Sequence, residues 1–248
     1  MKILGIDIGG TGVKGAVVDT KKGVFVTDRL RIETPQPGTP DAVGEVVGRI
    51  ARHFDWDGQI GCTFPGVVMH GHVLTAANLD KAWIGTNASK HFGKITGSTV
   101  TVLNDADAAG VAEQAFGAAR KVDGVVLLIT LGTGIGSALL YHGDLVPNTE
   151  LGHLSLNGMD AEKYASELVR ERDGLGWSDW AGRLGEYFRL VEDLLWPDLY
   201  VVGGGISKDP DPWLPLVECR TKIVPARLRN KAGIIGAALH AERFGHHK

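Results

Sequence analysis

Cysteine is scarce in this sequence, and long hydrophobic runs are missing from it. Two cysteines, Cys62 and Cys219, are too few for a disulfide framework or a four-cysteine zinc site. No apolar stretch reaches the roughly 20 residues that a membrane-spanning helix needs, and the strand-like start at Met1 is unlike a signal peptide. We therefore expect a cytoplasmic protein with two buried free thiols, no zinc and no membrane partner.

A large excess of charge is also missing. The 26 basic and 29 acidic residues give a formal net charge of −3, which does not favour a nucleic-acid partner. Glycine, in contrast, is abundant, with 35 residues among 248, and much of it is clustered. Clustered glycines indicate tight turns and close approach of the backbone to a ligand.

Two of the glycine clusters lie between strand-like segments. The first covers residues 9–12, after an apolar run that contains Asp7. The second covers residues 132–136, and Thr130 in the strand before it follows Asp7 by 123 positions, about half the chain. A repeated unit of strand, glycine turn and strand predicts two similar α/β lobes whose turns face one cleft.

Helix-like and strand-like segments alternate in the rest of the chain. Strand-like runs end in polar or glycine residues, and ligands of open α/β sheets gather at such carboxyl ends. We predict an N-terminal lobe of residues 1–106 and a C-terminal lobe of residues 107–248, with a last helix that can pack back on the first lobe. The predicted helices cover residues 41–54, 106–116, 161–172, 180–195 and 232–244.

Each glycine cluster alone has more than one interpretation. The first matches the G-x-G-x-x-G pattern of dinucleotide-binding folds, but Gly15 leads into strand-like residues where that fold has a helix. An ordinary glycine-rich β-turn explains one cluster, and explains a repeated pair less well. Such turns present backbone N–H groups to phosphate oxygens, and Thr11, Lys14 and Thr133 add further donors. Asp7 is suited to hold Mg²⁺ directly or through water.

Asn104 and Asp105 follow a strand-like run and are the strongest candidates for catalysis. Asp105 is suited to accept the proton of an attacking hydroxyl, and Asn104 to hold the acceptor. The alternative is that the pair only caps the next helix, although Asp107 could serve as that cap instead. Phosphoryl transfer depends mainly on positioning and charge stabilisation, so one carboxylate with a metal ion and N–H cradles would suffice.

Glu150 and His153 are three residues apart, and Glu162 follows them. Carboxylates and an imidazole suit sugar hydroxyls, which need acceptors as well as donors. A zinc site would need further ligands at metal spacing, and the sequence offers none nearby.

Taken together, these segments resemble the ROK family of sugar kinases and repressors, and within it the branch that phosphorylates glucose with polyphosphate. The resemblance extends over nearly the whole chain. The matching segments are residues 6–11, 104–105, 131–134, 150–153, 202–206 and 233–238.

The resemblance implies an actin-like, ribonuclease H-like fold of two duplicated lobes that close on glucose, and a homodimer. It also implies that Asp105 is the base that activates the 6-hydroxyl of glucose. The residues implied around the sugar are Gly66, Asn78, Asn104, Asp105, Glu150, His153 and Glu162. The residues implied around the phosphates are Gly9, Gly10, Thr11, Gly12, Lys14, Gly132, Thr133, Gly134 and Gly204.

The sequence departs from the wider family in two places. Residues 154–160 stand where the family commonly has a cysteine-rich zinc motif, as in its zinc-free polyphosphate branch, and the helix-turn-helix arm of the repressors is absent. We expect a polyphosphate–glucose phosphotransferase that uses Mg²⁺. The alternatives are an ATP-dependent kinase for glucose, mannose or an N-acetylhexosamine, and a non-catalytic sugar-binding regulator.

The choice of phosphoryl donor depends on a basic C-terminal segment. Residues 218–248 contain seven lysines and arginines but only two acids, in a chain whose net charge is −3. This imbalance favours a polyanion as partner, and a solvated surface with scattered charges is the alternative. The glycines at 203–205, where the family binds its nucleotide, are retained. We predict polyphosphate as the preferred donor, bound by Arg227, Arg229 and Lys231, and ATP as a second one.

Overall fold

The computed structural model of the protein describes residues 1–245. Their contacts divide the chain into two compact units, unit 1 with residues 1–112 and 230–245, and unit 2 with residues 113–229. This division and the expected boundary after residue 106 both fall inside one helix, α3 (Asp105–Phe116). Among the described residues, no helix is long and apolar enough to cross a bilayer.

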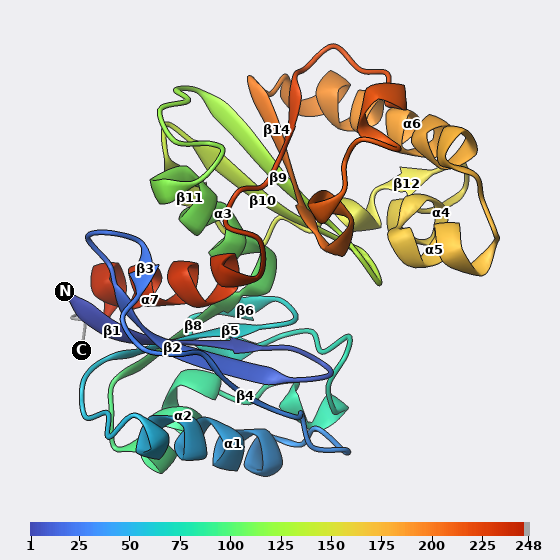
Figure 1. The fold of residues 1–248 in the computed structure, drawn as a ribbon. Helices are drawn as coiled ribbons and strands as arrows, with labels where there is room; N and C mark the ends of the chain where they lie inside the picture. The colour runs from blue at the N-terminus through green and yellow to red at the C-terminus, as the bar shows by residue number, and fades with distance from the viewer. Residues whose placement is uncertain (246–248) are drawn as a thin grey trace. The chain divides into compact units, whose positions relative to one another are not determined.

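Unit 1 is built on a six-stranded sheet with the strand order β3-β2-β1-β5-β8, in which β4 also pairs with β2 (Figure 1). β1 is antiparallel to β2 and parallel to β5, and β5 is parallel to β8. The strands are β1 (Lys2–Ile8), β2 (Val13–Asp19), β3 (Val24–Phe25), β4 (Leu30–Ile32), β5 (Ile60–Phe64) and β8 (Val100–Asn104).

Helices cover both faces of this sheet, with α1 (Pro40–His53) and α2 (Ala88–Thr96) on one side and α7 (Ala232–Phe244) on the other (Figure 1). The apolar face predicted for residues 41–54 is confirmed, because Val47 and Ile50 of α1 are fully buried in the core. α7 lies so close to the sheet that a Cβ on Gly61 would be 1.9 Å from the carbonyl oxygen of Ala237. The small elements of unit 1 are the hairpin of β6 (Val68–Met69) and β7 (His72–Val73) and the 3₁₀ helix η1 (Lys81–Trp83).

Unit 2 is built on a five-stranded sheet with the order β11-β10-β9-β14-β15. β9 is antiparallel to β10 and parallel to β14, and β14 is parallel to β15. The two sheets therefore repeat one order and one set of strand directions, which confirms the duplication predicted from the glycine clusters. The strands are β9 (Val125–Leu131), β10 (Ile135–Tyr141), β11 (Asp144–Val146), β14 (Leu199–Gly204) and β15 (Ile223–Pro225).

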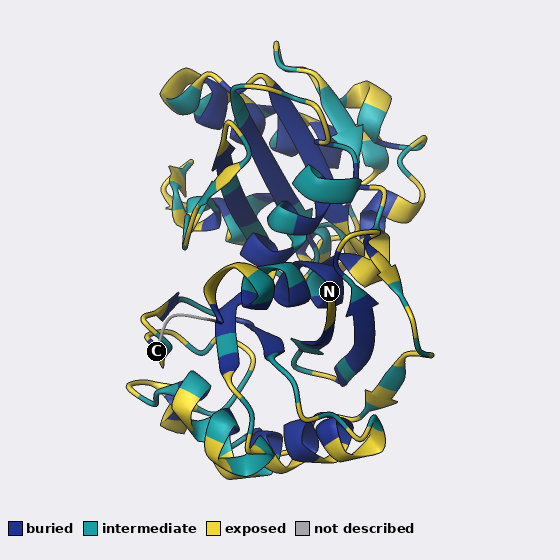
Figure 2. Cartoon of the chain, turned by 90° about the vertical axis from the view of Figure 1, so that its left-hand side faces the viewer, coloured by how far each residue is buried: buried dark blue, intermediate teal, exposed yellow. Residues whose placement is uncertain are grey.

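The long helix α6 (Trp177–Leu195) packs aromatic side chains on the unit 2 sheet. The hydroxyl of Tyr200 on β14 donates to the carbonyl oxygen of Phe188 at 3.0 Å, so its polar end is satisfied within the core. Figure 2 shows that the strands of both sheets are largely buried, whereas turns and outer helix faces are exposed. The small elements of unit 2 are β12 (Ser155–Leu156), β13 (Met159–Asp160), η2 (Leu151–His153), η3 (Gly205–Lys208) and η4 (Leu214–Leu216), and η5 (Arg229–Lys231) follows at its end.

Two sequence predictions need correction here. Residues 161–172 form two helices, α4 (Ala161–Ala165) and α5 (Glu167–Arg172), because Ser166 between them is extended and its hydroxyl accepts from the N–H of Val169 at 3.4 Å. Both cysteines are free, but only Cys62 is fully buried, whereas Cys219 is half-buried.

Candidate active site

The first glycine turn, residues 9–12, joins β1 to β2 in unit 1. The turn is closed by a hydrogen bond from the N–H of Gly9 to the carbonyl oxygen of Gly12 at 3.2 Å. Asp7 and Lys14 are paired across the two strands, and the ammonium of Lys14 lies 3.3 Å from one carboxylate oxygen of Asp7. The other carboxylate oxygen accepts from the hydroxyl of Thr63 at 3.0 Å. The entrance of the turn therefore carries a carboxylate and an ammonium, both held in place.

Side chains from the following segment hold the carbonyl groups of this turn. Arg31 on β4 donates to the carbonyl oxygen of Thr11 at 3.0 Å, and Gln36 donates to that of Gly10 at 3.3 Å. Asn78, which is predicted to contact the sugar, lies against Gly10. A Cβ added to Gly10 would be 3.1 Å from the Cβ of Asn78. These contacts anchor the turn, and they place Asn78 beside it.

Asn104 is the last residue of β8, and Asp105 is the first residue of α3. The side-chain oxygen of Asn104 accepts from the N–H groups of Ala106 at 2.8 Å and Asp107 at 3.1 Å, so Asn104 caps α3. The side-chain nitrogen of Asn104 donates to the carbonyl oxygen of Gly66 at 3.2 Å. This places three residues predicted for the sugar site next to one another: Gly66, Asn104 and Asp105.

The carboxylate of Asp105 is exposed and accepts from the N–H of Ala106 at 2.9 Å. An exposed carboxylate at a strand end has the chemistry that a general base needs.

The second glycine turn, Gly132 to Gly134, joins β9 to β10 in unit 2. It is closed by a hydrogen bond from the N–H of Gly132 to the carbonyl oxygen of Gly134 at 3.1 Å. Gly204 at the end of β14 pairs with Leu131, so the glycines 203–205 lie beside this turn. A Cβ on Gly204 would be 2.0 Å from the carbonyl oxygen of Leu131, and its φ of +88° is one that glycine adopts without strain.

Glu167, the first residue of α5, lies beside the glycines 203–205 and was missed by the sequence reasoning. A Cβ on Gly205 would be 3.5 Å from its carboxylate, and the N–H of the next residue, Leu168, donates to the carbonyl oxygen of Gly132 at 3.1 Å. Burial, together with the charge of Glu171, raises the pKa of Glu167 above its ordinary value. No motif surrounds Glu167 in the sequence, so only the fold identifies it.

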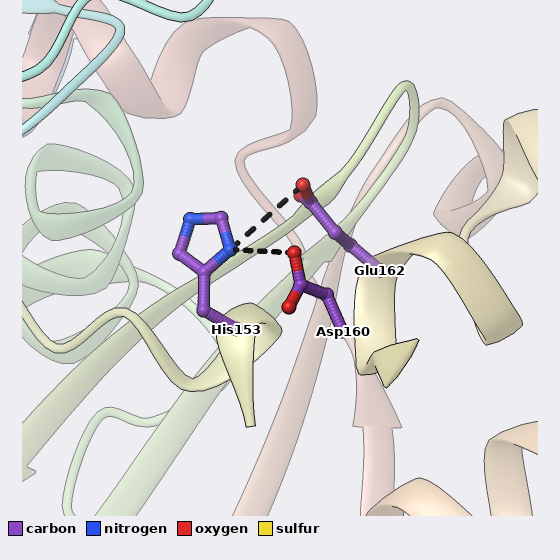
Figure 3. Close-up of side chains that lie close together, drawn as sticks. All are labelled: His153, Asp160 and Glu162. Atoms are coloured by element: carbon purple, nitrogen blue, oxygen red, sulfur yellow. Dashed lines mark ion pairs between the residues drawn. The ribbon is translucent and has the colours of Figure 1, made fainter. Parts of the chain in front are cut away.

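The His153 cluster, defined here as Glu150, His153, Asp160 and Glu162, is the second group of polar side chains in unit 2. Figure 3 shows the carboxylates of Asp160 and Glu162 pointing toward the ring of His153. One ring nitrogen lies 3.7 Å from Asp160 and 3.9 Å from Glu162, and the other lies 3.7 Å from Glu150. The backbone of η2 packs closely on β10, because a Cβ on Gly152 would be 2.1 Å from the carbonyl oxygen of Ile135.

Asp160 is the second residue that the sequence reasoning missed. A hydrogen bond from Lys163, at 3.0 Å, lowers the pKa of Asp160. The ligand atoms of His153, Asp160 and Glu162 all lie within 4.8 Å of one another, which is close enough to share one cation. The expectation that no metal ligands lie near His153 is therefore wrong. The signal in the sequence was the spacing of Asp160 and Glu162 at the start of a helix.

Glu162 also connects the His153 cluster to the second glycine turn. A Cβ on Gly134 would be 2.4 Å from a carboxylate oxygen of Glu162. Unit 2 thus brings together three of the residues predicted for the sugar, Glu150, His153 and Glu162, and one predicted for the phosphates, Gly134.

Comparison with known proteins finds relatives over most of the chain. A family model described as the ROK family matches residues 3–167. A polyphosphate glucokinase from Mycobacterium tuberculosis is 50% identical over 236 residues, which cover 95% of this chain and 89% of the relative.

Solved structures show the same likeness. The crystal structure of an inorganic polyphosphate/ATP-glucomannokinase from Arthrobacter sp. strain KM superposes with a TM-score of 0.91 at 51% identity and covers 98% of each chain. A ROK family glucokinase from Streptomyces griseus, solved with glucose and AMPPNP, has a TM-score of 0.85 at 24% identity over 98% of this chain and 100% of that one, and so it bears on the fold alone.

Proposed function

The chain belongs to the ROK family, and we propose that it transfers a phosphoryl group from inorganic polyphosphate to the 6-hydroxyl of glucose, giving glucose 6-phosphate. The likeness to polyphosphate glucokinases over 95% of the chain carries this proposal. The duplicated glycine turns and the exposed Asp105 support it, because they are the parts that phosphoryl transfer requires.

In this proposal Asp105 is the catalytic base. Its carboxylate accepts the proton of the 6-hydroxyl as the oxygen attacks the terminal phosphorus of the donor. The bond from that phosphorus to the bridging oxygen breaks, and the polyphosphate chain, shortened by one phosphate, leaves with the bridging oxygen. The cap that Asn104 forms on α3 holds Asp105 at the end of β8. The sugar is bound by Gly66, Asn78, Asn104 and Asp105 of unit 1 and by Glu150, His153 and Glu162 of unit 2.

The phosphates are bound by the glycine turns. The N–H groups of Gly9 and Gly132 close the turns, so the donors to phosphate are the other N–H groups of residues 9–12 and of Gly132 to Gly134, together with that of Gly204. Thr11, Thr133 and Lys14 are the side-chain donors. The side chain of Asp7 is 21% exposed and contacts Lys14. This environment fits a Mg²⁺ ion that keeps its water ligands and is bound through them better than an ion that has lost them. Bound there with the donor, Mg²⁺ would neutralise phosphate charge.

A second donor, ATP, is supported by the name of the Arthrobacter neighbour, a polyphosphate/ATP-glucomannokinase. The same name makes mannose a sugar to test beside glucose. The homodimer, the cytoplasmic location, and the absence of zinc and of nucleic-acid or membrane partners stay predictions.

The test is to compare the wild-type protein with Asp105→Asn in steady-state assays of glucose 6-phosphate formation from polyphosphate and from ATP. Loss of a general base lowers turnover by about 10²–10⁴-fold, so we expect kcat to fall by about a thousandfold while calorimetry shows glucose binding within a few-fold of wild type. Near-normal turnover of Asp105→Asn would remove Asp105 from the role of base.

Asp41→Asn is the matched control, because Asp41 also lies in the first turn of a helix, α1, and its side chain is 98% exposed. It removes the same charge and should keep wild-type turnover. If the wild-type protein forms no product from either donor, yet glucose raises its melting temperature, the chain is a sugar-binding regulator.

A further inference from the structure

Unit 2 contains a cavity of about 730 Å³ along β14 and β15 whose lining includes Lys222, Arg227 and Arg229. We propose that this cavity binds the phosphates of a polyphosphate chain that lie beyond the transferred group. The inference rests on the proposed function, and it assigns to the donor a binding site separate from the glycine turns.

The charge of the cavity supports a polyanion. The lining of the cavity contains three cations and one acid, Asp198. The carboxylate of Asp198 already accepts from the N–H of Val125 at 2.7 Å. Within the described part of the chain, neither Lys222, Arg227 nor Arg229 forms an ion pair. All three are exposed, so their charges are available to a ligand.

Other cations of the same basic segment are used differently. The guanidinium of Arg220 pairs with Asp193 at 2.9 Å and lies 4.2 Å over the ring of Trp196. Lys231, which was predicted to bind polyphosphate, does not line the cavity. Its ammonium lies 5.8 Å from the ring centre of Phe25 in unit 1. Lys248 lies outside the described residues. The cavity therefore contains two of the three cations predicted to bind polyphosphate, Arg227 and Arg229, and has Lys222 in place of Lys231.

The position of the cavity connects it to the donor. Ser207 lines it, and the hydroxyl of Ser207 donates to the carbonyl oxygen of Gly204 at 2.8 Å. Gly204 pairs with Leu131, directly before the second glycine turn. All of these residues belong to unit 2, so a chain whose end is held at the second glycine turn reaches the cavity with its next phosphates.

The lining favours a phosphate chain over a nucleotide base. Among the described residues, no aromatic side chain lines the cavity to stack on a purine. The walls are small and apolar, including Val122, Leu199 and Val224, and a low-dielectric wall strengthens the attraction between a nearby cation and a phosphate.

The test uses the full chain with three substitutions, Lys222→Gln, Arg227→Gln and Arg229→Asn. Asparagine is chosen at Arg229 because that residue has a φ of +50°, a conformation that asparagine tolerates. The control variant, Lys21→Gln with Lys90→Gln and Lys94→Gln, removes three exposed lysines of unit 1 and so the same charge.

We expect the KM for long-chain polyphosphate at low salt to rise about tenfold in the cavity variant, since each exposed charge contact contributes modestly. The KM for ATP should rise less than twofold, because ATP has no phosphates beyond its third. The slope of log KM for polyphosphate against log salt should become shallower by about two, as expected when three phosphate contacts are lost.

Two results would overturn the inference. Equal rises in KM for polyphosphate and ATP would make the cavity part of a nucleotide site, and a polyphosphate KM no higher than that of the control variant would leave it without a role. If the wild-type protein does not use polyphosphate at all, the proposed function itself fails, which is a distinct outcome. Thermal unfolding verifies that the triple variant is folded. If it is not, the single variant Lys222→Gln, at an exposed position, replaces it, and its KM for polyphosphate should rise two- to threefold.

Discussion

The two glycine turns have the same backbone plan and different surroundings. In unit 1 the turn follows Ile8 and its entrance carries the ion pair of Asp7 and Lys14. In unit 2 the corresponding residues are Thr130 and Gly136, which are paired across β9 and β10 and carry no charge. The turn itself is one residue shorter in unit 2, as its closing hydrogen bond joins Gly132 to Gly134 rather than Gly9 to Gly12.

This difference indicates a division of roles within a duplicated fold. The first turn brings fixed charges, and its carbonyl groups are held by Arg31, Thr34 and Gln36. The second turn has no charged pair at its entrance and is open at Gly132, where a Cβ would meet no atom within 4 Å, although the carboxylate of Glu162 lies against Gly134. An ion pair at the entrance suits a metal ion and its phosphates, whereas an open glycine suits direct contact of a backbone with phosphate.

Between the two turns, the largest expected effect comes from removing the charge at the first turn. Asp7→Asn leaves Lys14 without its partner and removes the carboxylate proposed for Mg²⁺, so we expect kcat/KM for polyphosphate to fall by a hundredfold or more, roughly the range that mutation of electrostatic groups gives. Thr130→Val, at the corresponding position of unit 2, should stay within about threefold. Equal effects of the two substitutions in a steady-state assay would contradict the division of roles.

The sequence alone predicted much of this comparison. The repeat of 123 positions predicted two similar units, and the strand orders confirm it. The unequal lengths of the turns were not used, although Val13 and Ile135 differ by 122 positions whereas Asp7 and Thr130 differ by 123. What the sequence could not predict are contacts between residues far apart in the chain, such as Thr63 with Asp7.

Local signals also left the candidate site incomplete for a physical reason. Capping and strand ends are local, so the cluster of Asn104 and Asp105 was found from a few neighbouring residues. Asp160 and Glu167 lie near proposed ligand groups only because β13, α4 and α5 fold back on the second glycine turn and the glycines beside it. Glu167 stands in no pattern of its own, and the break at Ser166 that orients α5 was hidden within a continuous helical pattern.

The helices α7 and α6 each carry an ionisable side chain with a shifted pKa, and the two side chains affect stability in different pH ranges. Burial lowers the pKa of His240 on α7 from 6.5 to about 4, and the charge of Arg243 acts in the same direction. The unfolded chain therefore binds a proton below pH 6.5 that the folded chain does not bind until about pH 4. We expect unfolding free energy to fall by about 2 kcal/mol between pH 7 and pH 5 from His240 alone, measured by urea unfolding, and His240→Gln to remove that part of the slope.

Glu192 on α6 provides the contrast. Burial alone would raise the pKa of Glu192, but hydrogen bonds from the N–H groups of Thr221 and Arg220 outweigh it, and the net pKa is lowered. Its contribution is present above the ordinary pKa of 4.5 and is lost only as the pH falls below it. Glu192→Gln should therefore keep the wild-type slope between pH 7 and pH 5; a flatter slope there would contradict the assignment to His240.

A smaller effect is expected inside the second turn, where neighbouring glycines have different surroundings. A methyl group on Gly134 would displace the carboxylate of Glu162, so Gly134→Ala should raise the KM for glucose about tenfold, as when one hydrogen-bonding group is lost. A methyl group on Gly132 meets no protein atom, so Gly132→Ala should raise the KM for the donor and not that for glucose. Glucose and donor titrations of both variants decide this, and a reversed pattern would exchange the two assignments.

The smallest effect concerns how the first turn is held. Arg31 donates to the carbonyl oxygen of Thr11. Its guanidinium also packs on Gly12, because a Cβ added to Gly12 would be 2.8 Å from the Nε of Arg31. Arg31→Gln loosens this contact, so we expect about a threefold rise in the KM for polyphosphate, in line with one exposed hydrogen bond. Arg29→Gln, which removes the same charge from an exposed neighbour, controls for long-range attraction of the polyanion. If both variants raise the KM equally and the rise disappears at high salt, Arg31 acts through its charge and the turn does not depend on being held.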